Sequence, residues 1–166
     1  ERINDIANNL LNQYRENSIL ASPVVLQRPE LISAIVDSIV SEKRAQFSHE
    51  QITFLLDIKD DSRHLFSLIN SSQFKRLLSN LINNAVEAVE HSTGVISISQ
   101  RIMDKSFVSI VIEDNGIGIC EDLIAKVLES GVTTKRQKGK GLGLSHAKQL
   151  IEQWGGELQL GSVPNK

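Results

Sequence analysis

The segment from Phe74 to Val89 has the clearest helical pattern in the chain, and it limits what the chain can fold into. Its apolar residues recur every three or four positions, and they are Phe74, Leu77, Leu78, Leu81, Ile82, Ala85, Val86 and Val89. This period predicts a helix with one apolar face. Such a face must be buried against other elements, so the fold needs a second layer.

Segments with alternating apolar residues supply that second layer. Strands are predicted at 24–26, 52–58, 65–69, 96–102, 108–112 and 158–160. Further helices are predicted at 1–16, from Pro29 to about residue 46, near 121–130, and from Leu144 to a glycine stop at Gly155-Gly156. Ser71-Ser72 can cap the helix that contains Phe74. The order predicts an α+β fold, a largely antiparallel sheet with helices on one face.

The first sixteen residues differ from the rest. Their apolar residues at positions 3, 7, 10 and 14 fit a coiled-coil seam, although two heptads do not separate a bundle helix from a core helix. Because the chain begins abruptly in a helical pattern and ends at Pro164-Asn165-Lys166 without a stop, it is expected to be a piece of a longer protein. A net charge of −2 gives no reason to expect nucleic acid as a partner. The single cysteine, Cys120, excludes an internal disulfide.

Three asparagines interrupt the helix around Phe74. Asparagine is a poor helix former, so Asn80, Asn83 and Asn84 need another explanation. Asn80 and Asn84 fall at the edge of the apolar face, where an amide oxygen could bind Mg²⁺ or could satisfy nearby backbone. Asn83 is expected to point toward solvent without a role.

The stretch "IEDNGIGIC" ends a buried strand with a carboxylate and two glycines. A hairpin turn needs only Asn115-Gly116, so Asp114 and Gly118 remain unexplained. A group that lies close against the backbone would explain them. An ordinary turn acid is the alternative for Asp114, but it leaves Gly118 unaccounted for.

The stretch "KGKGLGLSHAK" places three alternating glycines before a helix. Free N–H groups at a helix N-terminus suit phosphate, and lysines at 135, 138 and 140 add positive charge. A flexible basic connector is an equally good explanation of this loop alone. Taken together, a carboxylate for an exocyclic amine, an amide for a metal and a basic glycine loop indicate an adenine nucleotide with Mg²⁺.

"NLINNAVEAV", "DNGIGI" and "GKGLGL" resemble the N, G1 and G2 boxes of the catalytic ATP-binding domain of sensor histidine kinases, which are related to DNA gyrase, Hsp90 and MutL. The resemblance covers residues 24–163. It implies a two-layer α/β sandwich that binds ATP under a lid, with residues 21–166 as this domain and its last strand cut off. Residues 1–20 would then be the tail of a dimerisation and phosphoacceptor helix with its linker.

The resemblance also implies roles for individual residues. Asn84 would bind Mg²⁺, Asn80 would lie beside the phosphates, and Asp114 would hold the adenine amine above Gly116 and Gly118. The lid and triphosphate contacts would come from Lys135, Lys138, Gly139, Lys140, Gly141, Leu142, Gly143 and Leu144.

Position 80 favours a kinase over a hydrolase. The hydrolases of this group carry a glutamate there to activate water, and a neutral amide cannot act as a general base. Hydrolysis of the gyrase or MutL type, a serine kinase of the anti-sigma type and a non-catalytic nucleotide sensor are the alternatives.

None of the four histidines fits the phosphoacceptor, so the fragment is expected to lack its substrate. His49 superficially resembles an acceptor but reads as a surface loop residue. The resemblance implies a dimerisation domain of the same protein, a homodimeric parent and a response regulator receiver domain as partners. It also implies a cytoplasmic domain whose parent could be anchored in the inner membrane.

Overall fold

The computed structural model describes residues 28–89, 93–103, 107–120, 123–124, 127 and 143–162. Its strands are β1 (Arg28–Leu31), β2 (Ile52–Ile58), β3 (Phe66–Ile69), β4 (Gly94–Ile102) and β5 (Val108–Asp114). Its helices are α2 (Ile32–Gln46), α3 (Ser71–Val89) and α5 (Gly143–Gln153), and a 3-10 turn, η1, spans Asp60–Ser62.

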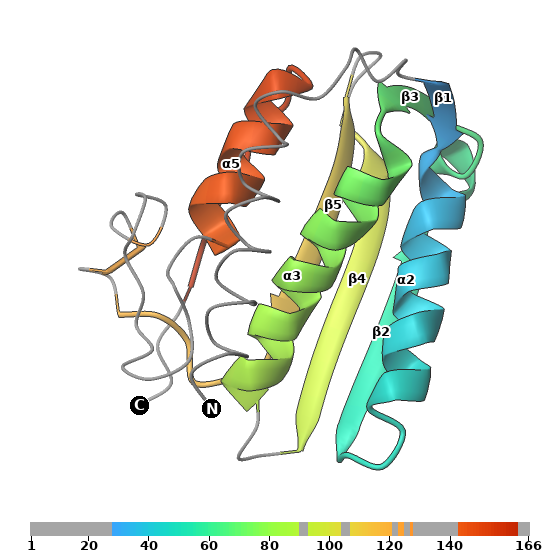
Figure 1. The fold of residues 1–166 in the computed structure, drawn as a ribbon. Helices are drawn as coiled ribbons and strands as arrows, with labels where there is room; N and C mark the ends of the chain where they lie inside the picture. The colour runs from blue at the N-terminus through green and yellow to red at the C-terminus, as the bar shows by residue number, and fades with distance from the viewer. Residues whose placement is uncertain are drawn as a thin grey trace, which may run out of the picture.

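The strands form one three-stranded sheet and one two-stranded ribbon. In the sheet, with the order β2-β4-β5, β2 runs parallel to β4 and β4 runs antiparallel to β5. In the ribbon, β1 pairs with β3 in the antiparallel sense. Figure 1 shows α2 and α3 on the same face of the sheet, with α5 beside α3 on the side away from α2. The predicted α+β fold with a mixed sheet and helices on one face is confirmed.

Helix α3 lies at the centre of the core. Its apolar face includes Ile82, which is fully buried, and packs against Ile96 and Ile98 of β4. On its flank, α2 contributes Val36 and Val40, which are also fully buried. The apolar residues that predicted this helix are therefore largely the residues that it buries, because they face the sheet or a neighbouring helix.

Two predicted helix starts are wrong. Pro29 does not begin a helix but lies in β1 opposite Leu68, in a ribbon of only two strands where a residue without an N–H is tolerated. Helix α2 begins instead at Ile32, whose N–H bonds to the Leu65 carbonyl at 3.1 Å. At the start of α3, the capping group is Asn70 Oδ1, which accepts from the Gln73 N–H at 2.9 Å, rather than a serine hydroxyl.

The end of α5 follows its glycine signal, but the strand predicted after it does not form. Gly155 has a φ of 77°, and the Gly156 N–H bonds to the Ile151 carbonyl at 2.9 Å, which closes the helix. Residues 157–162 carry no strand, and there the Ser162 hydroxyl accepts from the Ile119 N–H at 2.7 Å.

Several predicted segments fall outside the described part of the chain. These are the helix at 1–16, the strand at 24–26, most of the helix near 121–130 and the loop before Gly143. Of the helices that are described, none has the length and apolar character needed to cross a membrane.

Candidate functional site

The polar face of α3 carries two of the predicted site residues. Asn84 is exposed, and Asn80, one turn earlier, is half-buried. At 3.6 residues per turn the two side chains leave the helix within about 40° of each other. They therefore share one side of α3, as the sequence predicted, while the apolar side of the same helix faces the core.

The prediction for Asn83 is wrong. This residue does not point freely to solvent, because its Oδ1 accepts a hydrogen bond from Lys43 Nζ at 2.7 Å. Helix α2 covers that side of α3, which a helical projection of one segment could not reveal. Asn83 therefore joins two helices.

Asp114 ends β5 with an exposed side chain that is held in place. Its Oδ1 accepts from the Gly116 N–H at 2.9 Å. The next residue, Asn115, fixes the turn to the start of β4: its Oδ1 accepts from the Val95 N–H at 2.7 Å and its Nδ2 donates to the Thr93 carbonyl at 3.1 Å. Sequence reasoning treated Asn115 only as a turn residue and missed this anchoring role.

The two glycines after Asp114 have different physical reasons. A Cβ on Gly116 would lie 2.5 Å from the Ala88 carbonyl oxygen, so what lies close against this backbone is α3 itself. The neighbouring Ile117 N–H bonds to that same oxygen at 3.1 Å. Gly118 instead has a φ of 72°, a conformation that residues with a Cβ rarely adopt. The turn is thereby fixed to the last helical turn of α3.

Helix α5 begins at Gly143 and Leu144, the end of the glycine loop, and packs along α3. Phe74 and Trp154 meet edge to face at one end of this contact, with ring centroids 6.0 Å apart. A pocket of about 50 Å³ lies between the two helices. This volume suits a small polar group or water and is too small for a nucleobase.

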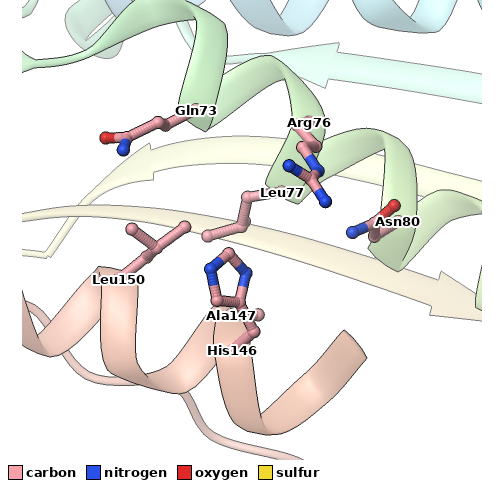
Figure 2. Close-up of a pocket in the computed structure, with 7 residues that line it drawn as sticks. All are labelled: Gln73, Arg76, Leu77, Asn80, His146, Ala147 and Leu150. Carbon is pink, nitrogen blue, oxygen red and sulfur yellow. The ribbon is translucent and has the colours of Figure 1, made fainter. Parts of the chain in front are cut away.

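Four polar side chains line that pocket together with apolar ones. Its lining residues are Gln73, Arg76, Leu77, Asn80, His146, Ala147 and Leu150. In Figure 2, the Arg76 guanidinium and the His146 ring project into the space between the helices, with Asn80 beside Arg76. The sequence analysis named Asn80 as a site residue but did not name Arg76. The spacing of four residues between Arg76 and Asn80, which places them on one helix face, is a usable signal.

The remaining predicted phosphate ligands belong to the loop before α5. Lys135, Lys138, Gly139, Lys140, Gly141 and Leu142 all lie outside the described residues. Among the residues that are described, no group of three or more His, Cys, Asp or Glu side chains could hold a metal. A divalent cation bound beside Asn80 and Asn84 would be held by amide oxygens, by water and by oxygens of a bound ligand.

The chain matches the family described as "Histidine kinase-, DNA gyrase B-, and HSP90-like ATPase" over residues 69–166, more than half of its length. It is 29% identical over 159 residues to sporulation kinase E of Bacillus subtilis, covering 92% of this chain and 21% of the relative. It is 31% identical over 125 residues to sensor histidine kinase GlnK of the same organism, covering 72% of this chain and 29% of that relative. The chain thus spans less than a third of either relative.

Among solved structures, the catalytic domain of histidine kinase ThkA superposes with a TM-score of 0.67 at 25% identity, covering 76% of this chain and 80% of that one. The matched residues 69–166 include all three boxes, and this structural neighbour is a histidine kinase catalytic domain. The chain therefore belongs to the histidine kinase-, DNA gyrase B- and HSP90-like ATPases, as an ATP-binding catalytic domain of the sensor histidine kinase type.

Proposed function

We propose that this domain transfers the γ-phosphoryl group of Mg-ATP to a histidine on an adjoining dimerisation domain of the same protein. The observation that supports the proposal is that the turn after β5, with Asp114, and the start of α5 both lie against α3, the helix that carries Asn80 and Asn84. The turn after β5 bonds to the Ala88 carbonyl at the end of α3, and α5 packs on α3 around the pocket that contains Asn80. A carboxylate suited to the base and amides suited to the metal thus lie at or beside a single helix.

Asp114 is the proposed adenine contact. One carboxylate oxygen accepts from Gly116, and in the described part of the chain this is the only hydrogen bond to that side chain. The second oxygen is therefore available to accept from the exocyclic amine of adenine. Asp114→Asn replaces this acceptor with a group that can turn its NH₂ toward the base, so ATP affinity should be lost while the fold remains.

Asn84 is the proposed protein ligand of Mg²⁺, with Asn80 beside the phosphates. Both are neutral oxygen donors on one side of α3, and a hard cation that retains waters accepts such ligands. When bound, Mg²⁺ would neutralise charge on the phosphates of ATP. The basic lid residues 135–140 would supply further positive charge, and Asn84→Asp should change the Mg²⁺ dependence of ATP binding.

Transfer to an external nucleophile is favoured over hydrolysis because position 80 is an asparagine. An amide cannot remove a proton from water, so water is poorly activated. In the transfer step an imidazole nitrogen forms a bond to the γ-phosphorus as the bond to the bridging oxygen breaks. ADP departs with that electron pair, and the imidazole N–H proton passes to solvent or to a neighbouring base.

The partners follow from the same proposal. The phosphoacceptor would lie on a dimerisation domain, the parent would be a homodimer, and the phosphoryl group would pass to a response regulator. ThkA, the structural neighbour, has been crystallised with the response regulator TrrA, which supports a receiver domain as partner. We further propose that the domain works in the cytoplasm, where ATP is available, whether or not its parent is membrane-anchored.

The proposal is tested by mixing the 166-residue chain with γ-labelled ATP, Mg²⁺ and a separately purified dimerisation domain of the parent. Label should appear on that domain as an acid-labile, base-stable phosphohistidine. It should be absent with Asp114→Asn or with the acceptor histidine replaced. ATP binding without any transfer would favour a nucleotide sensor, and rapid release of free phosphate without the acceptor domain would favour a hydrolase.

A further inference from the structure

A buried lysine joins α2 to the asparagine-rich stretch of α3. Lys43 is only 3% exposed, and its ammonium donates to Asn83 Oδ1 at 2.7 Å and to Gln46 Oε1 at 3.0 Å. The same nitrogen lies 5.8 Å from the centroid of the Phe47 ring. Lys43 therefore has neutral acceptors and an aromatic face around its charge.

Burial of the Lys43 ammonium is unfavourable for the free energy of folding. Lysine is almost never fully buried unless it is paired, and no ion pair joins Lys43 to a carboxylate in the part of the chain that the structure describes. Burial lowers the pKa of Lys43, while the nearby Glu42 acts in the opposite direction. An apolar residue would fill this place at lower cost, so stability alone does not account for a lysine here.

The position of Asn83 suggests what the lysine does. Asn83 lies directly before Asn84, the proposed Mg²⁺ ligand, and three residues after Asn80. Because these residues lie within about one and a half turns of α3, a hydrogen bond that holds Asn83 toward α2 restrains the rotation of this part of the helix, in addition to the buried apolar face. Asn80 and Asn84 then leave α3 on a side set by the Lys43–Asn83 bond.

We infer that Lys43 is a positioning residue for the metal end of the site: it sets the rotation of α3 through Asn83 and so aims Asn84. The inference rests on the proposed function, since it concerns Mg²⁺ bound with ATP. Lys43 would not touch ATP or metal itself. A purely structural lysine is the competing explanation, and it predicts a loss of stability without a selective change in metal dependence.

The test compares Lys43→Met with Arg44→Met in the 166-residue chain. Methionine keeps the length of the side chain but cannot donate. Arg44 is the matched control because it is the neighbouring cation on α2, yet its guanidinium donates to the Phe54 carbonyl of β2, at 2.8 and 3.2 Å, rather than to α3. Calorimetry would measure the ATP dissociation constant in EDTA and across a Mg²⁺ titration.

Positioning and simple electrostatics predict opposite signs. Loss of a positive charge near a metal site should by itself tighten Mg²⁺ binding. If Lys43 aims Asn84, Lys43→Met should instead reduce the enhancement of ATP affinity by Mg²⁺ about five- to tenfold, with ATP affinity in EDTA changed less than about twofold. Arg44→Met should leave the enhancement within about twofold of wild type.

A second variant keeps the inference testable if Lys43→Met folds poorly. Lys43→Met with Asn83→Leu removes both polar groups and should restore a cooperative thermal transition, but the Mg²⁺ enhancement should stay reduced. A wild-type enhancement in either folded variant would overturn the inference. Absence of Mg-dependent ATP binding in the wild-type chain would instead overturn the proposed function, so the two failures are distinguishable.

Discussion

Replacement of Gly116 by alanine should destabilise the domain through one identifiable clash. The new Cβ would lie 2.5 Å from the Ala88 carbonyl oxygen, 2.6 Å from its carbon and 2.7 Å from Ala88 Cβ, and Cβ contacts under 3.0 Å essentially never occur. Two of these three atoms are helix backbone and cannot rotate away. The turn and α3 must therefore separate by about 0.5 Å or more.

This displacement destabilises the domain in two ways. Overpacking of this kind costs about 1–3 kcal/mol. The adjacent bond from the Ile117 N–H to the Ala88 oxygen, now 3.1 Å, would lengthen beyond hydrogen-bonding distance and cost about 1 kcal/mol more. The free energy of unfolding should fall by about 2–4 kcal/mol, which corresponds to a Tm lower by roughly 4–16 °C for a domain of this size.

Urea and thermal denaturation followed by circular dichroism would measure this change. Gly161→Ala is the matched control, because no atom lies within 4 Å of a Cβ at that position. Because the Gly116 N–H bonds to the Asp114 carboxylate, moving this turn should also move Asp114. The Gly116→Ala variant should therefore bind ATP more weakly than the wild type. If Gly116→Ala and Gly161→Ala had the same stability within about 0.5 kcal/mol, the close approach of the turn to α3 would be refuted.

Three further changes separate other contributions. Gly155→Ala meets open space but has a φ of 77°, so backbone strain alone should cost about 1–2 kcal/mol in urea denaturation; no loss would contradict the left-handed cap of α5. Asn70→Ala removes the acceptor for the Gln73 N–H and should cost about 1 kcal/mol, whereas Asn70→Asp keeps the cap; equal stability of the two variants would exclude it. Because burial lowers the pKa of Lys43 from 10.5, the unfolded chain binds more protons between the lowered value and 10.5. The wild-type free energy of unfolding should therefore rise relative to that of Lys43→Met as pH increases through this window, and a constant difference across it would contradict the buried ammonium.

The elements with strong local patterns could be predicted from the sequence. Helix α3 was predictable because its apolar period is unbroken from Phe74 to Val89, and strands β4 and β5 were predictable because both alternate. The parallel pairing of β2 with β4 could not be derived, because alternation is the same in parallel and antiparallel strands. Pro29 was misread for a similar reason, since its preference for a first helical turn says nothing of the ribbon that β3 offers.

The site shows the same division between local and long-range causes. Asp114 was marked by its chemistry within a short segment. Gly118 was assigned to the close approach of another group, but the structure gives it a positive φ instead. The reason for Gly116 is the backbone of α3 at Ala88, and the contact of Asn83 is Lys43 forty residues earlier. Neither partner can be found from the segment itself, because each is brought close only when the helices pack.

The proposed function requires a nucleotide between the end of β5 and the polar side of α3. A crystal of the 166-residue chain soaked with Mg²⁺ and a non-hydrolysable ATP analogue tests this directly. The adenine amine should lie within hydrogen-bond distance of the Asp114 carboxylate, with the metal near Asn84. An analogue bound elsewhere, or a base that does not contact Asp114, would contradict the account.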